Sequence, residues 1–268
     1  MGPVTTAILA MGGLGVFLSI LLGVAAKVFF VYVDPRIGQV ADVLPGANCG
    51  GCGYAGCSDC AAAMVEGKAP VNACKAGGAS VAQAVAGVLG ISAAAAEREV
   101  ARIFCKGDSA RAERKFKYMG INDCRAAMLV SGGDKSCSYG CLGLGTCVAN
   151  CPFGALSMGE DGLPRVDDEK CTACGTCVKL CPRHIPKVVP VSQKAASLCS
   201  SHDVGKLVKE ICEAGCLGCG LCKKACPEKA VEVVKFLSVV DHTKCTGCGK
   251  CFEKCPTGII QSLVFTVV

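Results

Sequence analysis

The chain has 268 residues, of which 51% are hydrophobic and 5% aromatic, and 25 of them are cysteines. So many cysteines in a chain of this length do not form the disulfide framework of a short secreted domain. The formal charge of +6 takes no account of bound metal and therefore does not indicate a nucleic-acid partner.

The N-terminal stretch is predicted to cross a membrane. Residues 7–26 read AILAMGGLGVFLSILLGVAA without a charge, which matches the ~20 apolar residues that span a bilayer. A cleaved signal peptide is excluded by the length of the run and by the lack of Lys or Arg before it. Lys27 and Arg36 follow the run and predict that the C-terminal side is cytoplasmic. Residues 1–33 are the expected single-pass anchor in the lipid bilayer of the cell membrane.

Residues 34–104 are predicted to form a small domain with helices. It begins with the stretch NCGGCGYAGCSDC at 48–60, where the spacing C-x2-C-x4-C is followed by a distant Cys74. The glycines within it spell G-x-G-x-x-G, but no strand precedes them and cysteines interrupt them, so dinucleotide binding is excluded. An Ala- and Val-rich segment at 80–104 predicts one or two further helices, with Ser92 as an N-cap and Val100, Ile103 and Phe104 at helical spacing.

Four cysteine runs dominate the remaining sequence. Three of them, CTACGTCVKLCP at 171–182, CLGCGLCKKACP at 216–227 and CTGCGKCFEKCP at 245–256, fit the bacterial ferredoxin pattern C-x2-C-x2-C-x3-C-P. The first run, CSYGCLGLGTCVANCP at 137–152, has longer early spacings. Such runs come in pairs, so residues 137–190 and 212–268 are predicted to be two ferredoxin modules, joined by a linker at 191–211.

The spacing also predicts which thiolates share a cluster. Three cysteines two residues apart wrap one [4Fe–4S] cluster, while the fourth, before proline, ligates the partner cluster. The crosswise sets predicted on this basis are Cys137, Cys141, Cys147 with Cys181; Cys171, Cys174, Cys177 with Cys151; Cys216, Cys219, Cys222 with Cys255; and Cys245, Cys248, Cys251 with Cys226.

Zinc is the competing interpretation of these runs. A structural zinc site uses two short cysteine knuckles separated by a longer spacer, and it has no use for a third cysteine two residues on. Iron–sulfur clusters fit the spacing better. Five oxidised cubanes of about −2 each would bring the formal charge from +6 to about −4.

Five cysteines fall outside these sets: Cys60, Cys105, Cys124, Cys199 and Cys212. Buried free thiols are the usual role of such residues. A further cluster that uses Cys105 and Cys124 with two other ligands is the alternative. Residues 105–136 are otherwise expected to be a linker or helical segment, and the basic side chains at 111–117 are expected to face solvent.

The order of these elements resembles the B subunits of Rnf complexes, the ion-translocating ferredoxin:NAD oxidoreductases of bacterial membranes. The resemblance rests on one N-terminal span, the stretch PGANCGGCGYAGCSDCA at 45–61 with a distant Cys74, and tandem ferredoxin runs. It implies that Cys49, Cys52, Cys57 and Cys74 ligate a cluster, which makes at least five [4Fe–4S] clusters in an α+β chain. It also implies a soluble ferredoxin as electron donor and the other Rnf subunits as partners.

The predicted function is therefore electron transfer within an ion-translocating oxidoreductase. No Walker loop, usable dinucleotide fold or catalytic triad is present, so no independent bond-changing site is expected. The alternatives are a membrane-bound polyferredoxin that serves another reductase or hydrogenase, and a zinc-binding scaffold. An acidic ferredoxin is expected to dock on the lysines around the last cluster loops, Lys223, Lys224, Lys229, Lys244, Lys250 and Lys254, or else beside Lys179, Arg183 and Lys187.

Overall fold

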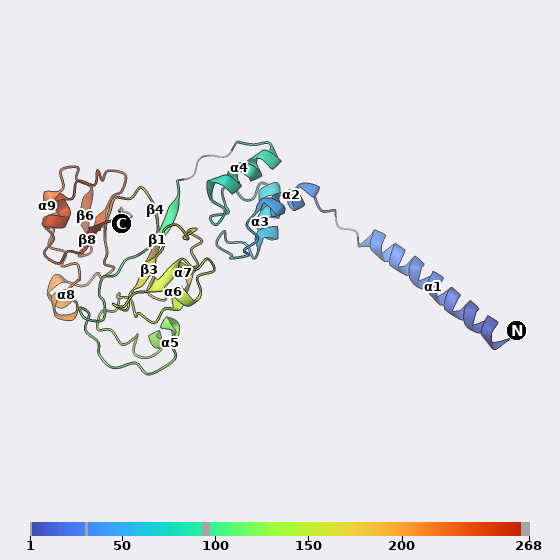
Figure 1. Cartoon of the computed structure of the whole chain (residues 1–268), viewed down its shortest axis with the longest axis horizontal. Helices are drawn as coiled ribbons and strands as arrows, with labels where there is room; N and C mark the ends of the chain where they lie inside the picture. The colour runs from blue at the N-terminus through green and yellow to red at the C-terminus, as the bar shows by residue number, and fades with distance from the viewer. Residues whose placement is uncertain (1, 30–31, 93–96, 264–268) are drawn as a thin grey trace.

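The structure is a computed structural model that describes residues 2–29, 32–92 and 97–263. Its helices and strands follow one another along an elongated chain, with a long N-terminal helix apart from the other elements (Figure 1). Every strand belongs to a two-stranded antiparallel sheet, and short helices lie between the strands. This mixture confirms the expected α+β class.

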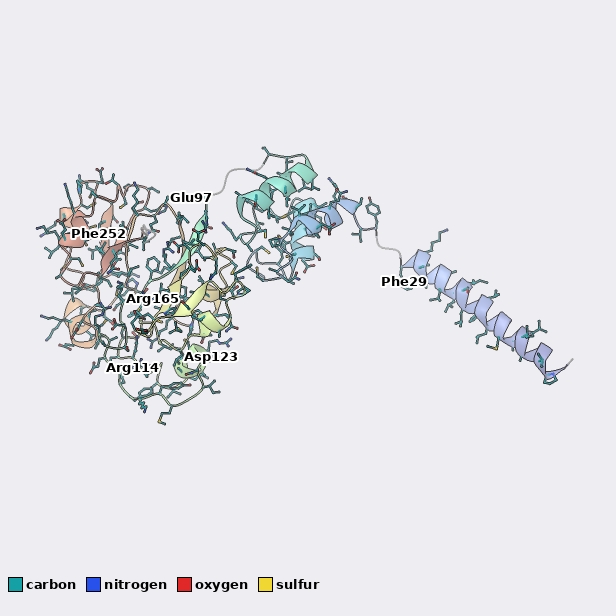
Figure 2. The ribbon with its side chains drawn as sticks, viewed as in Figure 1. Phe29, Glu97, Arg114, Asp123, Arg165 and Phe252 are labelled. Atoms are coloured by element: carbon teal, nitrogen blue, oxygen red, sulfur yellow. The ribbon has the colours of Figure 1, made fainter. Side chains whose placement is uncertain are left out.

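The N-terminal helix α1 covers Pro3–Val28. Its portion Ala7–Val28 is long and apolar enough to cross a membrane, and none of it is buried against the rest of the chain. Phe29 follows at the helix end, and its side chain is exposed (Figure 2). An apolar helix with no protein partner is consistent with burial in lipid instead.

Three helices form the small domain: α2 (Pro35–Val43), α3 (Cys57–Val65) and α4 (Gly78–Leu89). Asp34 caps α2 by accepting the backbone N–H of Arg36. The core between them contains Val40, Met64 and Val85, together with the partly buried Cys52, Cys57 and Cys74. A domain with so few large apolar side chains gains much of its stability from any metal that these cysteines bind.

The sequence-based expectation of a second helix before Phe104 is wrong. Glu99–Ile103 is strand β1, which pairs with β4 (Pro186–Pro190) from Glu99 opposite Pro190 to Ile103 opposite Pro186. The helix start expected at Ser92 would involve residues 93–96, which lie outside the described residues. The spacing of Val100 and Ile103 suits a helix, but pairing with a strand 87 positions along the chain decides the conformation.

The first ferredoxin module contains α6 (Thr146–Ala149), β2 (Leu156–Met158), β3 (Pro164–Val166) and α7 (Thr176–Leu180) as well as β4. β2 and β3 form a hairpin, and α6 packs on α7. Before this module, α5 (Cys124–Met128) is capped by Asp123, which accepts the N–H groups of Arg125 and Ala126.

The second module repeats this plan. It contains α9 (Leu221–Ala225), β6 (Val231–Val234), β7 (Leu237–Val240), α10 (Lys250–Glu253) and β8 (Ile260–Ser262). The expected linker at 191–211 contains two further elements, β5 (Ala195–Ser197) and α8 (Gly205–Ile211). β6 pairs with β7, and β5 pairs with β8. Most cysteines of this module pack with Val231, Ile259 and Ile260 in one apolar core, whereas Cys219 and Cys248 are exposed.

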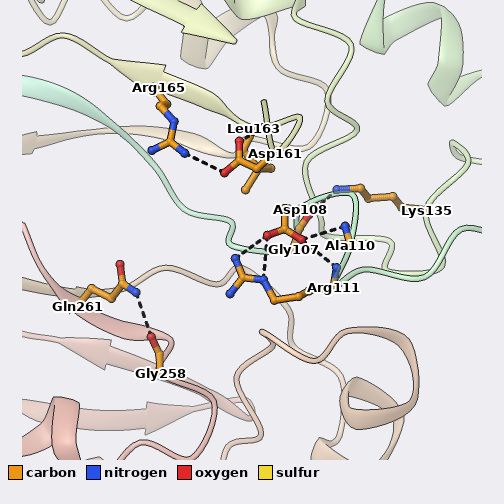
Figure 3. A network of polar contacts seen from close by, with 10 residues as sticks. All are labelled: Gly107, Asp108, Ala110, Arg111, Lys135, Asp161, Leu163, Arg165, Gly258 and Gln261. Atoms are coloured by element: carbon orange, nitrogen blue, oxygen red, sulfur yellow. Dashed lines mark hydrogen bonds and ion pairs between the residues drawn. The ribbon is translucent and has the colours of Figure 1, made fainter. Parts of the chain in front are cut away.

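The segment 105–136 precedes the first module in the sequence and contacts both modules in space. The N–H of Ser109 donates to the Asp161 carbonyl oxygen, and the N–H of Glu213 donates to the Arg111 carbonyl oxygen. Asp108 accepts the N–H groups of Ala110 and Arg111 and forms an ion pair with the Arg111 guanidinium at 2.6 Å (Figure 3). The neighbouring Lys135 donates to the carbonyl oxygen of Gly107 (Figure 3). Of the basic residues at 111–117, Arg114, Lys115 and Lys117 are exposed as expected, whereas Arg111 is half-buried in its ion pair with Asp108.

Candidate iron–sulfur sites

A glycine in the left-handed conformation opens each cysteine-bearing helix of the two modules. Its φ lies between 72° and 78° at all four positions, a conformation that side chains larger than hydrogen disfavour. The third cysteine of the run follows two residues later in the first turn of the helix. These glycines are Gly145, Gly175, Gly220 and Gly249.

The fourth cysteine of three runs accepts a backbone hydrogen bond from the residue four positions on. The N–H groups of Ala155, Ile185 and Ala230 lie 3.3, 3.4 and 3.3 Å from the sulfur atoms of Cys151, Cys181 and Cys226, respectively. In an iron–sulfur protein, hydrogen bonds to the ligand sulfurs tune the potential of the cluster. Each of these loops therefore holds a backbone donor against the sulfur of its fourth cysteine.

In the second module the structure brings together the cysteines that the spacing pairs crosswise. Cys216, Cys219, Cys222 and Cys255 line one cavity. Cys226, Cys245, Cys248 and Cys251 line the next. Each cavity takes three cysteines from one run and the fourth from the other run.

In the first module Cys151, Cys171 and Cys177 pack together with Leu156 and Ala101. The N–H of Ala101 in β1 donates to the sulfur of Cys171 at 3.3 Å, so this strand contributes directly to the site. Burial raises the pKa of Cys177 to about 12. The neighbouring thiols raise it further, Cys147 most, followed by Cys174, Cys171 and Cys151.

The remaining cavity of the first module differs from the set predicted by spacing. It is lined by Cys124, Cys141, Cys147 and Cys181, whereas Cys137 lines a separate cavity with Cys105, Cys199 and Cys212. The reason lies in the stretched spacing. Cys141 precedes Cys147 by six residues, as Cys171 precedes Cys177, so Cys141 occupies the first position of the pattern and Leu144 the second.

Spacing alone leaves Cys124 among the spare thiols. The signal that identifies it is the match between LGTC at 144–147 and CGTC at 174–177, which shows that a leucine stands where a ligand is expected. In the structure, the thiol of Cys124 at the start of α5 lines this cavity. Thr146 holds this start in place, because its hydroxyl accepts the N–H of Cys124 at 2.7 Å.

The cysteines of the small domain also lie together. Burial raises the pKa of Cys74, and the nearby thiols of Cys52, Cys57 and Cys49 raise it further. Cys60 is buried on α3, and burial raises its pKa to about 12. Its helix position, three residues after Cys57, makes it part of the domain core.

A single metal ion does not fit these thiols as they stand. Four thiolates around one zinc ion at about 2.3 Å would place the sulfurs about 3.8 Å apart. Within residues 2–29, 32–92 and 97–263, no group of three or more Cys, His, Asp or Glu side chains has the geometry to hold one metal ion. Three of the sets instead line a cavity each, and a cubane binds its four thiolates at four different irons.

The small domain contacts the first module beside a cysteine. A Cβ atom on Gly51 would overlap the carbonyl oxygen of Cys174, so only glycine permits this approach. The Lys179 ammonium donates to the carbonyl oxygen of Gly50 at 2.8 Å. The loop that carries Cys49 and Cys52 therefore lies against the loop that carries Cys174.

Two models of iron–sulfur protein families match the chain. A family model described as a putative Fe–S cluster matches residues 44–76, and a 4Fe–4S dicluster domain model matches residues 136–185 and 215–259.

Three curated relatives match most of the chain, and each is the B subunit of an ion-translocating complex. That of the Na⁺-translocating ferredoxin:NAD⁺ oxidoreductase complex of Acetobacterium woodii is 50% identical over 87% of this chain and 70% of its own length. That of the ion-translocating oxidoreductase complex of Methanosarcina acetivorans is 46% identical over 88% of this chain and 90% of its own. The B subunit of the proton-translocating ferredoxin:NAD⁺ oxidoreductase complex of Clostridium ljungdahlii is 45% identical over 91% of this chain and 86% of its own length.

Proposed function

Because this chain belongs to the family of B subunits of ion-translocating ferredoxin:NAD⁺ oxidoreductase complexes, we propose that it accepts electrons from reduced ferredoxin and relays them to other subunits of the complex. The observation that carries the proposal is the row of cysteine-lined cavities in one polypeptide. A bound [4Fe–4S] cluster stores one electron at a potential set by charge, hydrogen bonds and exposure.

The proposed ligands form at least five sets of four thiolates. The sets are Cys49, Cys52, Cys57, Cys74; Cys124, Cys141, Cys147, Cys181; Cys151, Cys171, Cys174, Cys177; Cys216, Cys219, Cys222, Cys255; and Cys226, Cys245, Cys248, Cys251. Backbone N–H groups donate to the sulfurs of Cys151, Cys181 and Cys226, and such hydrogen bonds tune the potential of a bound cluster.

The proposed entry point for electrons is the second module. All 25 cysteines lie among the described residues, and Cys219 and Cys248 alone are exposed. Around them the lysines of the cluster loops also face solvent: Lys223, Lys224, Lys229, Lys244, Lys250 and Lys254. An acidic ferredoxin would find both a basic surface and a short path to buried sulfur there.

The alternative entry beside the first module has less support. The Arg183 guanidinium donates to backbone carbonyls of Cys137 and Gly140 at 2.7 and 2.6 Å. Lys179 binds Gly50, and the Lys187 ammonium lies 4.7 Å from the centre of the Phe104 ring. Arg183 is half-buried, and although Lys179 and Lys187 are exposed, each of the three cations already has a partner within the chain.

We further propose that α1 is the single membrane span and that the cluster-binding part faces the cytoplasm. Its apolar surface and the two basic residues Lys27 and Arg36 support this orientation. The reducing cytoplasm also keeps thiolates free for iron. The contact of Gly51 with Cys174 supports transfer of electrons between the small domain and the first module.

The test is anaerobic reduction of the purified full-length protein by reduced ferredoxin, followed by stopped-flow absorbance. The expected result is rapid bleaching of the iron–sulfur absorbance in a protein that holds at least about 20 iron and 20 sulfide atoms per chain. A protein with about twelve of each, or one that ferredoxin leaves oxidised, would contradict the proposal. Zinc in place of iron would identify a scaffold instead.

A further inference from the structure

Four cysteines outside the five proposed sets line one cavity. They are Cys105 after β1, Cys137 in the first module, Cys199 after β5 and Cys212 after α8. They come from four separate segments, so their common location results from the tertiary fold alone. None of them forms a disulfide.

We infer that Cys105, Cys137, Cys199 and Cys212 bind a further [4Fe–4S] cluster, which links the two ferredoxin modules. The inference goes beyond the five clusters of the proposed function and rests on it only for the direction of electron flow.

The cavity has the size and the donors of the other sites. It encloses about 430 Å³, counted with the space open to solvent, against about 410, 310 and 330 Å³ for the three cavities of the ferredoxin runs. Backbone N–H groups are aimed at two of its sulfurs. Cys141 donates to Cys105 at 3.3 Å, and Ser201 donates to Cys199 at 3.4 Å.

The ammonium group of Lys135 is a buried positive charge in the cavity wall, and a nearby anion would stabilise it. Lys135 lines the cavity with 1% of its surface exposed, and its ammonium donates to the Gly107 carbonyl oxygen. No Asp or Glu among the described residues forms an ion pair with it. The adjacent Asp134 pairs with Arg114. Burying an unpaired ammonium is costly, and four thiolates around an oxidised cubane carry a net charge of about −2 that would offset it.

The cavity lies between the sites of the two modules. Cys141, which lines the neighbouring cavity of the first module, donates its N–H to Cys105. Cys216, which lines a cavity of the second module, donates its N–H to Cys199 at 3.5 Å. One hydrogen bond on each side therefore joins this cavity to the next site.

The stretch at 104–112, which follows β1, contacts the stretch at 200–212 around this cavity. Ala112 and Cys212 form an antiparallel bridge, and the Ser200 hydroxyl donates to the Phe104 carbonyl oxygen at 3.0 Å. An electron that leaves a reduced site of the second module would reduce this site, and its transfer to the Cys141 site would oxidise it again. Without a cluster in this cavity, no redox centre would lie between the Cys216 site and the Cys141 site.

The first test is the metal content of the anaerobically purified and reconstituted full-length protein. We expect about 24 iron and 24 sulfide atoms per chain, since six cubanes contribute four of each. A saturated value of about 20 would overturn the inference. It would leave the proposed function standing if ferredoxin still reduced the protein.

The second test uses paired alanine substitutions, because two missing ligands abolish a cluster. Cys199→Ala with Cys212→Ala should remove about four iron atoms, and Cys105→Ala with Cys137→Ala should remove the same four. The quadruple variant should therefore still lose about four. A loss of about eight would show that the pairs belong to different clusters, and no loss would show that these thiols bind no iron.

Two controls complete the design. Cys216→Ala with Cys222→Ala should remove about four iron atoms on its own and bring the total loss to about eight when combined with the Cys199 and Cys212 pair. Cys60→Ala should remove none. If the cavity variants fail to fold, the wild-type iron content alone decides the question. A protein with about 24 iron atoms that ferredoxin does not reduce would contradict the proposed function and not this inference.

Discussion

At the scale of single residues, Arg183 illustrates how a side chain outside the ligand sets holds a cluster loop. Its guanidinium donates to the carbonyl oxygens of Gly132, Cys137 and Gly140, and burial lowers its pKa. It fixes the backbone of the stretched run, where the regular spacing is lost. The residue follows Pro182 and belongs to no recognised motif, so only the fold identifies its role.

Replacing Arg183 by leucine should weaken the cavities that Cys137 and Cys141 line. Each buried carbonyl left without a donor costs about 1–3 kcal/mol, so the free energy of unfolding should fall by several kcal/mol. The measurement is the rate of iron release to a chelator, which should rise while ferredoxin still reduces the second module. Arg165→Leu is the matched control, because its ion pair with Asp161 is exposed and worth about 0–1 kcal/mol. Equal iron release from the two variants would contradict the role of Arg183.

Gly51 is the second residue whose importance follows from a contact. Gly51→Ala should push the small domain away from Cys174, because the added Cβ has no room. The expected result is slower electron transfer between the small domain and the first module at unchanged iron content, followed by freeze-quench electron paramagnetic resonance. Gly38→Ala is the control, since a Cβ there meets no atom within 4 Å. An unchanged rate of electron transfer in Gly51→Ala would show that electrons do not pass through this contact.

At the scale of elements, α9 and α10 carry the proposed docking surface. Replacing Lys223, Lys224 and Lys250 by glutamate should slow reduction by ferredoxin and weaken its dependence on ionic strength, since screening acts over a Debye length of ~10 Å. Lys117, Lys206 and Lys209 are exposed elsewhere, and their replacement by glutamate gives the same change in net charge. If ferredoxin docks on α9 and α10, the control variant with Lys117, Lys206 and Lys209 replaced should be reduced at close to the wild-type rate.

The helix α1 should act as an anchor and contribute nothing to cluster binding, because no part of its apolar span packs on the protein. Deleting residues 7–33 should release a soluble chain with the full iron content. A reporter fused after the C-terminus of the intact protein should be accessible only from the cytoplasm. Labelling from outside intact cells would reverse the proposed topology, and a membrane-bound deletion variant would show a second anchor.

At the scale of the whole molecule, the sheets are too small to stabilise the fold alone. Each has two strands, and the apolar core of the second module consists largely of cysteines and their neighbours. Burial raises the pKa of Cys141 to about 12, so an empty site holds a protonated thiol there, and iron binding must release the proton. Metal binding and folding are therefore expected to be coupled.

Anaerobic removal of iron should unfold both modules. Far-ultraviolet circular dichroism should lose the strand signal of the modules, while α1 keeps its helical signal in detergent. Reconstitution with iron and sulfide should restore the spectrum. An apo protein with the spectrum of the holo protein would show that the apolar core suffices for folding.

The local repeats of the sequence were enough to predict the α+β class, the anchor helix and the existence of the iron–sulfur modules, because cluster loops and membrane spans depend on residues close together in the chain. Tertiary structure alone decided that Cys124 and not Cys137 lines the cavity of Cys141, that residues 99–103 form a strand, and that Cys105, Cys199 and Cys212 lie together. Those features join residues tens of positions apart, and spacing along the chain carries no information about them. The leucine at position 144 was the one local sign that a ligand had to come from elsewhere.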